Sequence, residues 1–146
     1  MTSIKNFFSA EEKKKIVEAI QRAELNTSGE IRLHVESSAH GNVLDSAAYW
    51  FKKLSMNKTE ARNGVLFYLA LHDRQFAIIG DVGINEKVAE NFWDTTKESM
   101  QNNFKKGLIT EGLVHGIELA GNQLKEFFPY QKDDVNELPD DISFGK

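Results

Sequence analysis

The side chains with the clearest chemical potential stand where apolar segments of the sequence begin or end. Three of them offer carboxylate or amide oxygens, the ligands that hard cations such as Ca²⁺ and Mg²⁺ prefer. These candidate metal ligands are Glu30, Asn63 and Asp81, and the residues expected to support them are Arg62, Gly80 and Gly83. They are distant from one another in the sequence, so they form one site only if the fold brings the ends of their segments together.

Three segments have the apolar pattern of β-strands. Residues 30–37 alternate between apolar and polar side chains, which predicts one buried face and places His34 on the polar face. Residues 64–71 are continuously apolar, which is typical of a central strand buried on both faces. After a short polar turn, residues 75–80 are predicted to return antiparallel to that strand.

Four further segments have helical patterns, and together with the strands they define the fold. Ser9 and Glu12 form the S-x-x-E pattern of a capping box, which opens a helix with one apolar face. A helix between the first two strands makes these strands parallel, with a right-handed crossover. The predicted class is α/β: a three-layer α/β/α sandwich in which helices flank a small mixed β-sheet, made of a parallel βαβ unit and an antiparallel hairpin. The later helices are predicted at residues 43–54, 85–106 and 110–128, with Pro129 ending the last one.

This topology places all the candidate ligands at one end of the sheet. The two parallel strands begin there, and the antiparallel strand ends there. The opposite end, roughly 23 Å away, collects a second polar set. The rule that open α/β sheets bind ligands at the carboxyl ends of their strands favours that second end, so a site there stays an alternative. Its residues are Glu36, Ser37, His40, Asp45, His72, Asp73 and Arg74.

A purely structural interpretation of the first end is the competing explanation. Glycines at strand ends are mostly turn residues, and Arg62 could pair with Glu30 or Asp81 simply to hold the loops together. No catalytic residue is assigned. The turn after Asp81 is not an EF-hand, because Phe92 stands where the twelfth-position glutamate would be. Phosphate-binding-loop and serine-hydrolase motifs are absent, and no residue is expected to bind an organic cofactor.

Size and composition narrow the classes of function. The 146 residues suit one domain, assigned to residues 1–130 and followed by an acidic segment at 131–146. The chain has no cysteine, which excludes disulfides and thiol chemistry. A net charge of −4 without a long basic cluster argues against nucleic-acid binding. No apolar run is long enough for a secretory signal or a membrane span, so a soluble cytoplasmic protein is expected.

Four short motifs carry a family likeness. SGEI, RNGVL and GDVGI at the three strand junctions, and NELPD in the tail, resemble the TPM-domain proteins, a family named for a thylakoid-lumen phosphatase. The likeness covers roughly residues 7–143 and is greatest to the short, soluble bacterial members. It implies an α/β/α sandwich, binding of Ca²⁺ or Mg²⁺ by loops at one end of the sheet, and a tail that packs partly on the domain. The family pattern is matched at Glu30, Arg62, Asn63, Gly64, Asp81, Gly83, Asn136, Glu137 and Asp140.

Two functional hypotheses result. The first is a protein that binds a divalent cation, Ca²⁺ or Mg²⁺; the acid phosphatase activity attributed to plant members extends this to weak metal-assisted hydrolysis of phosphate monoesters. Its partners would be the metal ion and a phosphate-containing ligand. The second is a non-enzymatic module that binds a partner protein and whose ion site is structural. The sequence places no nucleophile and no general base at the candidate site, which favours binding over catalysis.

Overall fold

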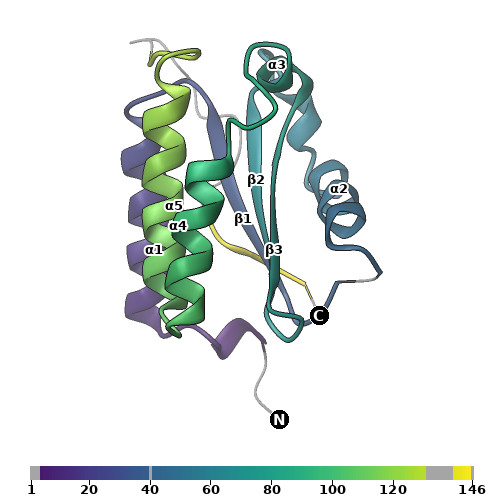
Figure 1. Cartoon of the computed structure of the whole chain (residues 1–146), viewed down its shortest axis with the longest axis vertical. Helices are drawn as coiled ribbons and strands as arrows, with labels where there is room; N and C mark the ends of the chain where they lie inside the picture. The colour runs from purple at the N-terminus through teal and green to yellow at the C-terminus, as the bar shows by residue number, and fades with distance from the viewer. Residues whose placement is uncertain (1–3, 40, 131–139, 146) are drawn as a thin grey trace.

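The chain folds into helices on both faces of one mixed sheet. The computed structural model describes residues 4–39, 41–130 and 140–145. Helices α1, α4 and α5 cover one face of the sheet, α2 covers the other, and the short α3 lies at one end of the strands (Figure 1). The predicted α/β class and its mixed sheet are confirmed. The elements are η1 Ile4–Asn6, α1 Ala10–Glu24, β1 Glu30–Glu36, α2 Val43–Lys53, η2 Met56–Lys58, β2 Gly64–Ala70, β3 Gln75–Gly80, α3 Val82–Asn85, α4 Asp94–Lys105, α5 Ile109–Leu124 and β4 Ser143–Phe144.

The sheet has the strand order β3-β2-β1-β4. Strand β1 is parallel to β2, and β2 is antiparallel to β3, as the βαβ unit and the hairpin predict. The fourth strand was not predicted: Ser143 and Phe144 pair in parallel with His34 and Val35 at the edge of β1. A two-residue strand carries too little alternation to be recognised in a sequence.

Two apolar clusters fix the strands between the helical layers. The larger one lies between the sheet and α1, α4 and α5, and the smaller one lies under α2. Strand β2 is buried along its whole length, as its continuous apolar run predicts. Helix α1 opens with the predicted capping box, in which the Ser9 hydroxyl accepts from the Glu12 amide and the Glu12 carboxylate accepts from the Ser9 amide.

The prediction for the second face of β1 is wrong. His34 is fully buried and Glu36 is 2% exposed, although the alternating pattern placed both on a polar face. Trp50 of α2 stacks on the His34 ring, with ring centroids 3.9 Å apart, and β4 covers the edge beside it. The polar residues of β1 are therefore enclosed by elements that come from distant parts of the sequence.

The helix expected at 85–106 begins only at Asp94, because residues 86–93 form turns between the short α3 and α4, and the last helix is shorter than expected. Ile84 is fully buried at the end of the sheet, whereas Trp93 is buried at the start of α4, so the chain must turn between the two anchors. The Gln123 amide donates to the Phe92 carbonyl at 2.7 Å and holds that turn against α5. Helix α5 ends at Leu124, and Pro129 forms a bridge with Thr27 instead of directly ending the helix. None of the helices in the described ranges is long and apolar enough to cross a membrane.

Candidate metal site

The amino pole, defined here as the end of the sheet where β1 and β2 begin and β3 ends, gathers the candidate ligands. Glu30 is paired with Gly64 across the first two strands. The Asp81 amide, just after β3, donates to the carbonyl of Gly64, the first residue of β2, at 2.9 Å. Because neighbouring strands lie about 4.8 Å apart, the backbones of Glu30 and Asp81 are separated by roughly 10 Å. Both residues are only 4% exposed.

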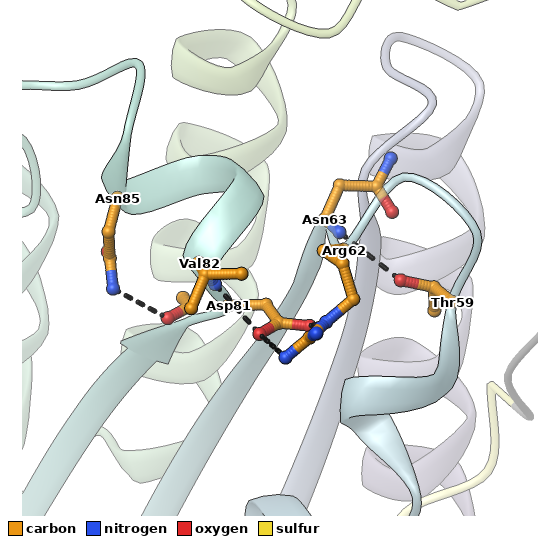
Figure 2. Close-up of polar contacts among 7 residues, drawn as sticks. Thr59, Arg62, Asn63, Asp81, Val82 and Asn85 are labelled. Atoms are coloured by element: carbon orange, nitrogen blue, oxygen red, sulfur yellow. Dashed lines mark hydrogen bonds and ion pairs between the residues drawn. The ribbon is translucent and has the colours of Figure 1, made fainter.

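Asp81 is held by a two-point ion pair with Arg62 (Figure 2). Arg62 Nε donates to Oδ2 at 2.7 Å, and Nη2 donates to Oδ1 at 2.9 Å. Oδ1 also accepts from the Val82 amide at 2.7 Å, which caps α3. The hydrogen bonds to Asp81 raise the pKa of Arg62 above its ordinary value. The Arg62–Asp81 pairing that the structural interpretation considered is therefore present.

The loop before β2 and the turn after β3 approach each other at backbone level. The Arg62 carbonyl accepts from the Gly83 amide at 3.0 Å. A Cβ on Gly83 would overlap the Ala61 carbonyl and lie 2.5 Å from the Arg62 carbonyl oxygen. Arg62 itself has a φ of +51°. The glycine is thus required for close approach of two loops, and this contact brings Arg62 to Asp81.

Asn63 connects the starts of β1 and β2. Its side-chain Nδ2 donates to the Ser28 carbonyl at 3.0 Å, and its backbone carbonyl accepts from the Glu30 amide at 3.1 Å. The Asn63 backbone amide donates to Thr59 Oγ1 at 3.2 Å. Its side chain points away from the Arg62–Asp81 pair (Figure 2). Asn63 therefore belongs to the Glu30 side of the pole.

Further carboxylates, from α1 and from the segment before β4, join Glu30. Glu24 Oε2 accepts from the Ile31 amide at 3.2 Å. Burial first, then a hydrogen bond with Asp140 and the charges of Asp140 and Glu30, raise the pKa of Glu24 to about 9. Three acidic residues are thus close enough to influence one another on the Glu30 side of the pole. Asp140 matched the family pattern, but Glu24 was not predicted. Its only sequence signal is a carboxylate in the last turn of a helix, which the helix dipole disfavours.

The described carboxylates of the amino pole, Glu24 and Asp140 included, do not form a closed cage for a metal ion. Within residues 4–39, 41–130 and 140–145, no group of three or more His, Cys, Asp or Glu side chains is arranged to hold a metal ion. Glu30 and Asp81 are two carboxylates on either side of Gly64, and the Met56 carbonyl oxygen lies 3.0 Å from where a Cβ on Gly64 would be. An ion at this pole would need an amide or carbonyl oxygen and water in addition to carboxylates.

At the opposite pole of the sheet, two of the acidic residues, Glu36 and Asp73, stabilise the fold. The Tyr68 hydroxyl donates to Glu36, and the Ala39 amide donates to Asp73 Oδ2 at 2.8 Å. His40, one of the two histidines considered there, lies outside the described residues. Glu36 and Asp73 of this alternative site are thus already engaged, by a hydroxyl and by a loop amide respectively.

The fold and the pole define a class: α/β sandwiches with a small mixed sheet and a polar loop cluster where the parallel strands begin. The TPM domain matches residues 2–123, so the chain belongs to the TPM-domain family, as its motifs predicted. Curated proteins give no match.

Solved structures resemble the chain, among them the following three. The BA42 protein from the psychrophilic bacterium Bizionia argentinensis is 50% identical, with a TM-score of 0.93 over 99% of this chain and 100% of that one. The N-terminal domain of a protein from P. gingivalis is 15% identical, with a TM-score of 0.70 over 86% of this chain and 83% of that one. The N-terminal domain of the cg2496 protein from Corynebacterium glutamicum is 12% identical, with a TM-score of 0.65 over 98% and 83%. At 15% and 12% identity, the last two show a shared fold only.

Proposed function

We propose that this chain binds one divalent cation, Ca²⁺ or Mg²⁺, at the amino pole, with Glu30, Asn63 and Asp81 as protein ligands. The family resemblance implies such binding. The observation that supports it best in this chain is the crowding of Glu24, Glu30 and Asp140. Burial, and after it this crowding, raises the pKa of Glu24 to about 9.

The physical argument is one of charge. Buried carboxylates are costly unless a cation or hydrogen-bond donors compensate them. On the Glu30 side of the pole, the structure compensates Glu24 with a proton and with the Ile31 amide. A divalent cation beside Glu30 would supply the positive charge instead and would let Glu24 ionise, so cation binding should release a proton near neutral pH.

Asp81 can join such a site without giving up its present contacts. A carboxylate has about four lone-pair positions. Asp81 uses three of them for the two bonds from Arg62 and the one from Val82. The remaining position is on Oδ2. Arg62, whose side chain is 44% exposed, would stay beside the ion and could meet an anionic group of a ligand.

Calorimetric titration with Ca²⁺ and Mg²⁺ tests the proposal. Wild type should bind with one-to-one stoichiometry, and Glu30→Gln should lose at least about tenfold in affinity, because it removes one charged ligand. Glu98→Gln, a change of the same kind at an exposed position of α4, should bind like wild type. No heat and no saturable binding by wild type, or equal affinity in Glu30→Gln, would refute the proposal.

The bound cation could also support catalysis, in the form of metal-assisted hydrolysis of phosphate monoesters. The ion would polarise a phosphoryl oxygen or activate a water molecule. Its test is turnover of para-nitrophenyl phosphate at mildly acidic pH. Catalysis at the pole predicts turnover that requires the ion and is lost in both Glu30→Gln and Asp81→Asn. Equal turnover in wild type and in these variants would mark a contaminating enzyme.

One observation favours the alternative, a non-enzymatic module that binds a partner protein and uses the pole structurally. The three histidines within the described residues lie elsewhere: His34 in the middle of β1, His72 after β2 and His115 in α5. The sequence has no cysteine. An ion that binds at the pole without any turnover would therefore support this second function.

A further inference from the structure

The last described residues of the chain pair with the edge of β1 and pack against it. The Gly145 amide donates to the Val35 carbonyl at 2.8 Å. Phe144 packs against the larger apolar cluster, and Lys13 Nζ lies 5.5 Å from the centre of its ring. Gly145 fits because a Cβ there would lie 2.6 Å from Glu36 Cγ. Without β4, the edge of β1 would present unpaired backbone groups.

The same strand, β4, covers the buried side chain of His34. Ser143 Oγ lies 2.8 Å from His34 Nδ1, and the two residues are paired across β4 and β1. The His34 ring is fully buried, with Trp50 stacked on it. His34 Nε2 is 3.6 Å from Glu36 Oε1, and it has no hydrogen-bond partner among the described residues. The imidazole is therefore enclosed with one nitrogen bonded to β4 and the other left unbonded.

The charged and titratable groups around His34 come from β1 and β2. Glu36 is the nearest charge, and Arg32, on the same strand, opposes protonation. The Tyr68 hydroxyl of β2 donates a hydrogen bond to Glu36. Glu36 is the carboxylate that would compensate a protonated His34, and the bond from Tyr68 already occupies part of its hydrogen-bonding capacity. From α2 the contact is the uncharged Trp50, and from β4 it is the uncharged Ser143.

This environment disfavours a charge on His34 while β4 is in place. Burial is the largest influence and lowers the pKa of His34, and the attraction of Glu36 does not overcome it. Lifting β4 would open the edge of the ring to water. The pKa of His34 would then return toward the ordinary value of about 6.5, so the open form takes up a proton more readily than the closed form.

We infer that β4 is a proton-sensitive latch, which stays on the edge of β1 while His34 is neutral and is released when His34 is protonated. By linkage, a proton that binds the open form more tightly than the closed form shifts the population toward the open form. Below a pH of about 6.5 the latch loosens, and the edge of β1 becomes available for an extended segment to pair with it. The inference does not depend on a cation at the amino pole.

Hydrogen exchange of the Gly145 amide in the full chain tests the latch, because this amide donates directly to β1. Exchange is measured at pH 7.5 and pH 5.5 and corrected for the intrinsic rates. In wild type, protection should fall by up to about tenfold at the lower pH, because pH 5.5 is one unit below the ordinary histidine pKa of about 6.5. Equal protection at both values, or greater protection at pH 5.5, would overturn the inference, since it would mean that the imidazolium and Glu36 hold the strand.

Two variants and a control keep the test specific. His34→Gln retains an amide that can bond to Ser143 but cannot titrate, so the pH dependence should disappear; a retained dependence would overturn the inference. His115→Gln removes an exposed histidine of α5 and should behave like wild type. If His34→Gln does not fold, Ser143→Ala decides: it should lower Gly145 protection already at pH 7.5, and unchanged protection there would exclude the latch.

Discussion

Asp81 shows how one side chain can serve both structure and binding. Its carboxylate neutralises Arg62 and accepts from the first amide of α3. In the proposed site, Asp81 would have a third role as a ligand of the cation. Loss of binding in an Asp81 variant would therefore not identify a ligand unless the fold is measured at the same time.

Two substitutions separate the duties of Asp81. Asp81→Asn loses the charge opposite Arg62 but keeps an oxygen that can accept from Val82, whereas Asp81→Ala loses both. We expect Asp81→Ala to have the lower free energy of unfolding, by about 1 kcal/mol, the usual cost of a lost helix N-cap. Urea unfolding of both variants measures this difference. Equal stabilities would show that the cap to α3 contributes nothing.

Glu24 makes a pH-dependent contribution whose sign is opposite to that of most carboxylates. Its pKa is raised from 4.5 to about 9 in the folded chain, so the folded state keeps a proton that the unfolded state loses above pH 4.5. Stability from this group is therefore full below a pH of about 4.5 and declines as the pH rises to about 9.

Glu24→Gln should remove that dependence, because a neutral amide can still accept from Ile31. At pH 7.5 without divalent ions, the variant should be more stable than wild type by at least about 1.4 kcal/mol, the equivalent of one pKa unit. At pH 4 the two should differ little. Urea unfolding at both values measures it, and a variant less stable than wild type at pH 7.5 would contradict the crowding of carboxylates.

At the residue scale, the strand junctions of the sequence predicted where polar groups meet, but not all of their contacts. Glu30, Asn63 and Asp81 do lie at the same end of the sheet. Glu24 lies near Glu30 because α1 ends there, and His34 is buried because α2 and β4 cover it. These contacts depend on how distant segments pack, which alternation within one strand does not encode.

Among the elements, the hairpin β2–β3 with its flanking loops is the most tightly constrained part of the pole. The carbonyl groups of Ala61 and Arg62 leave no space for a Cβ at Gly83. Both are backbone atoms, which cannot move aside as the end of a side chain can.

Gly83→Ala should therefore destabilise the chain by about 1–3 kcal/mol, the typical cost of overpacking. Gly29→Ala is the matched comparison, because its Cβ would meet the end of the flexible Leu124 side chain at 3.1 Å. It should cost less. Thermal unfolding of both variants gives the ranking, and a Gly83→Ala protein as stable as Gly29→Ala would show that the two loops are not in close contact.

The helices divide into those that periodicity could predict and those that it could not. Helix α1 has a capping box and a regular apolar face, with Ile16, Ile20 and Ala23 in the core, and its prediction is confirmed. The single helix predicted over 85–106 is wrong at its start, because the helix covers only Asp94–Lys105. The break between α3 and α4 arises because Ile84 and Trp93 must be buried at two different places in the fold.

For the whole molecule, the sheet carries two polar regions at different positions along its strands. The amino pole gathers Glu24, Glu30, Asp81 and Asp140, whereas His34, Glu36 and Tyr68 lie toward the other end under α2. The first region is the proposed cation site, and the second is the proposed latch. The described tail touches both, because Asp140 meets Glu24 and Ser143 meets His34.

The fold was more predictable than the site. Apolar runs and their order predicted the mixed sheet and its layers, and the TPM family membership agrees with them. The structures with 15% and 12% identity share this fold. The site depends on distances between side chains from segments far apart in the sequence, and no single segment carries that information.

The measurement that tests the central proposal most directly is an amide NMR titration of metal-free protein with Ca²⁺ and then with Mg²⁺. We expect saturable shifts at Glu30, Asn63 and Asp81, with small changes at residues 36–39 and 72–74 of the opposite pole. Shifts confined to the opposite pole would move the site there. No shifts at millimolar ion would contradict cation binding and leave the amino pole as a structural cluster.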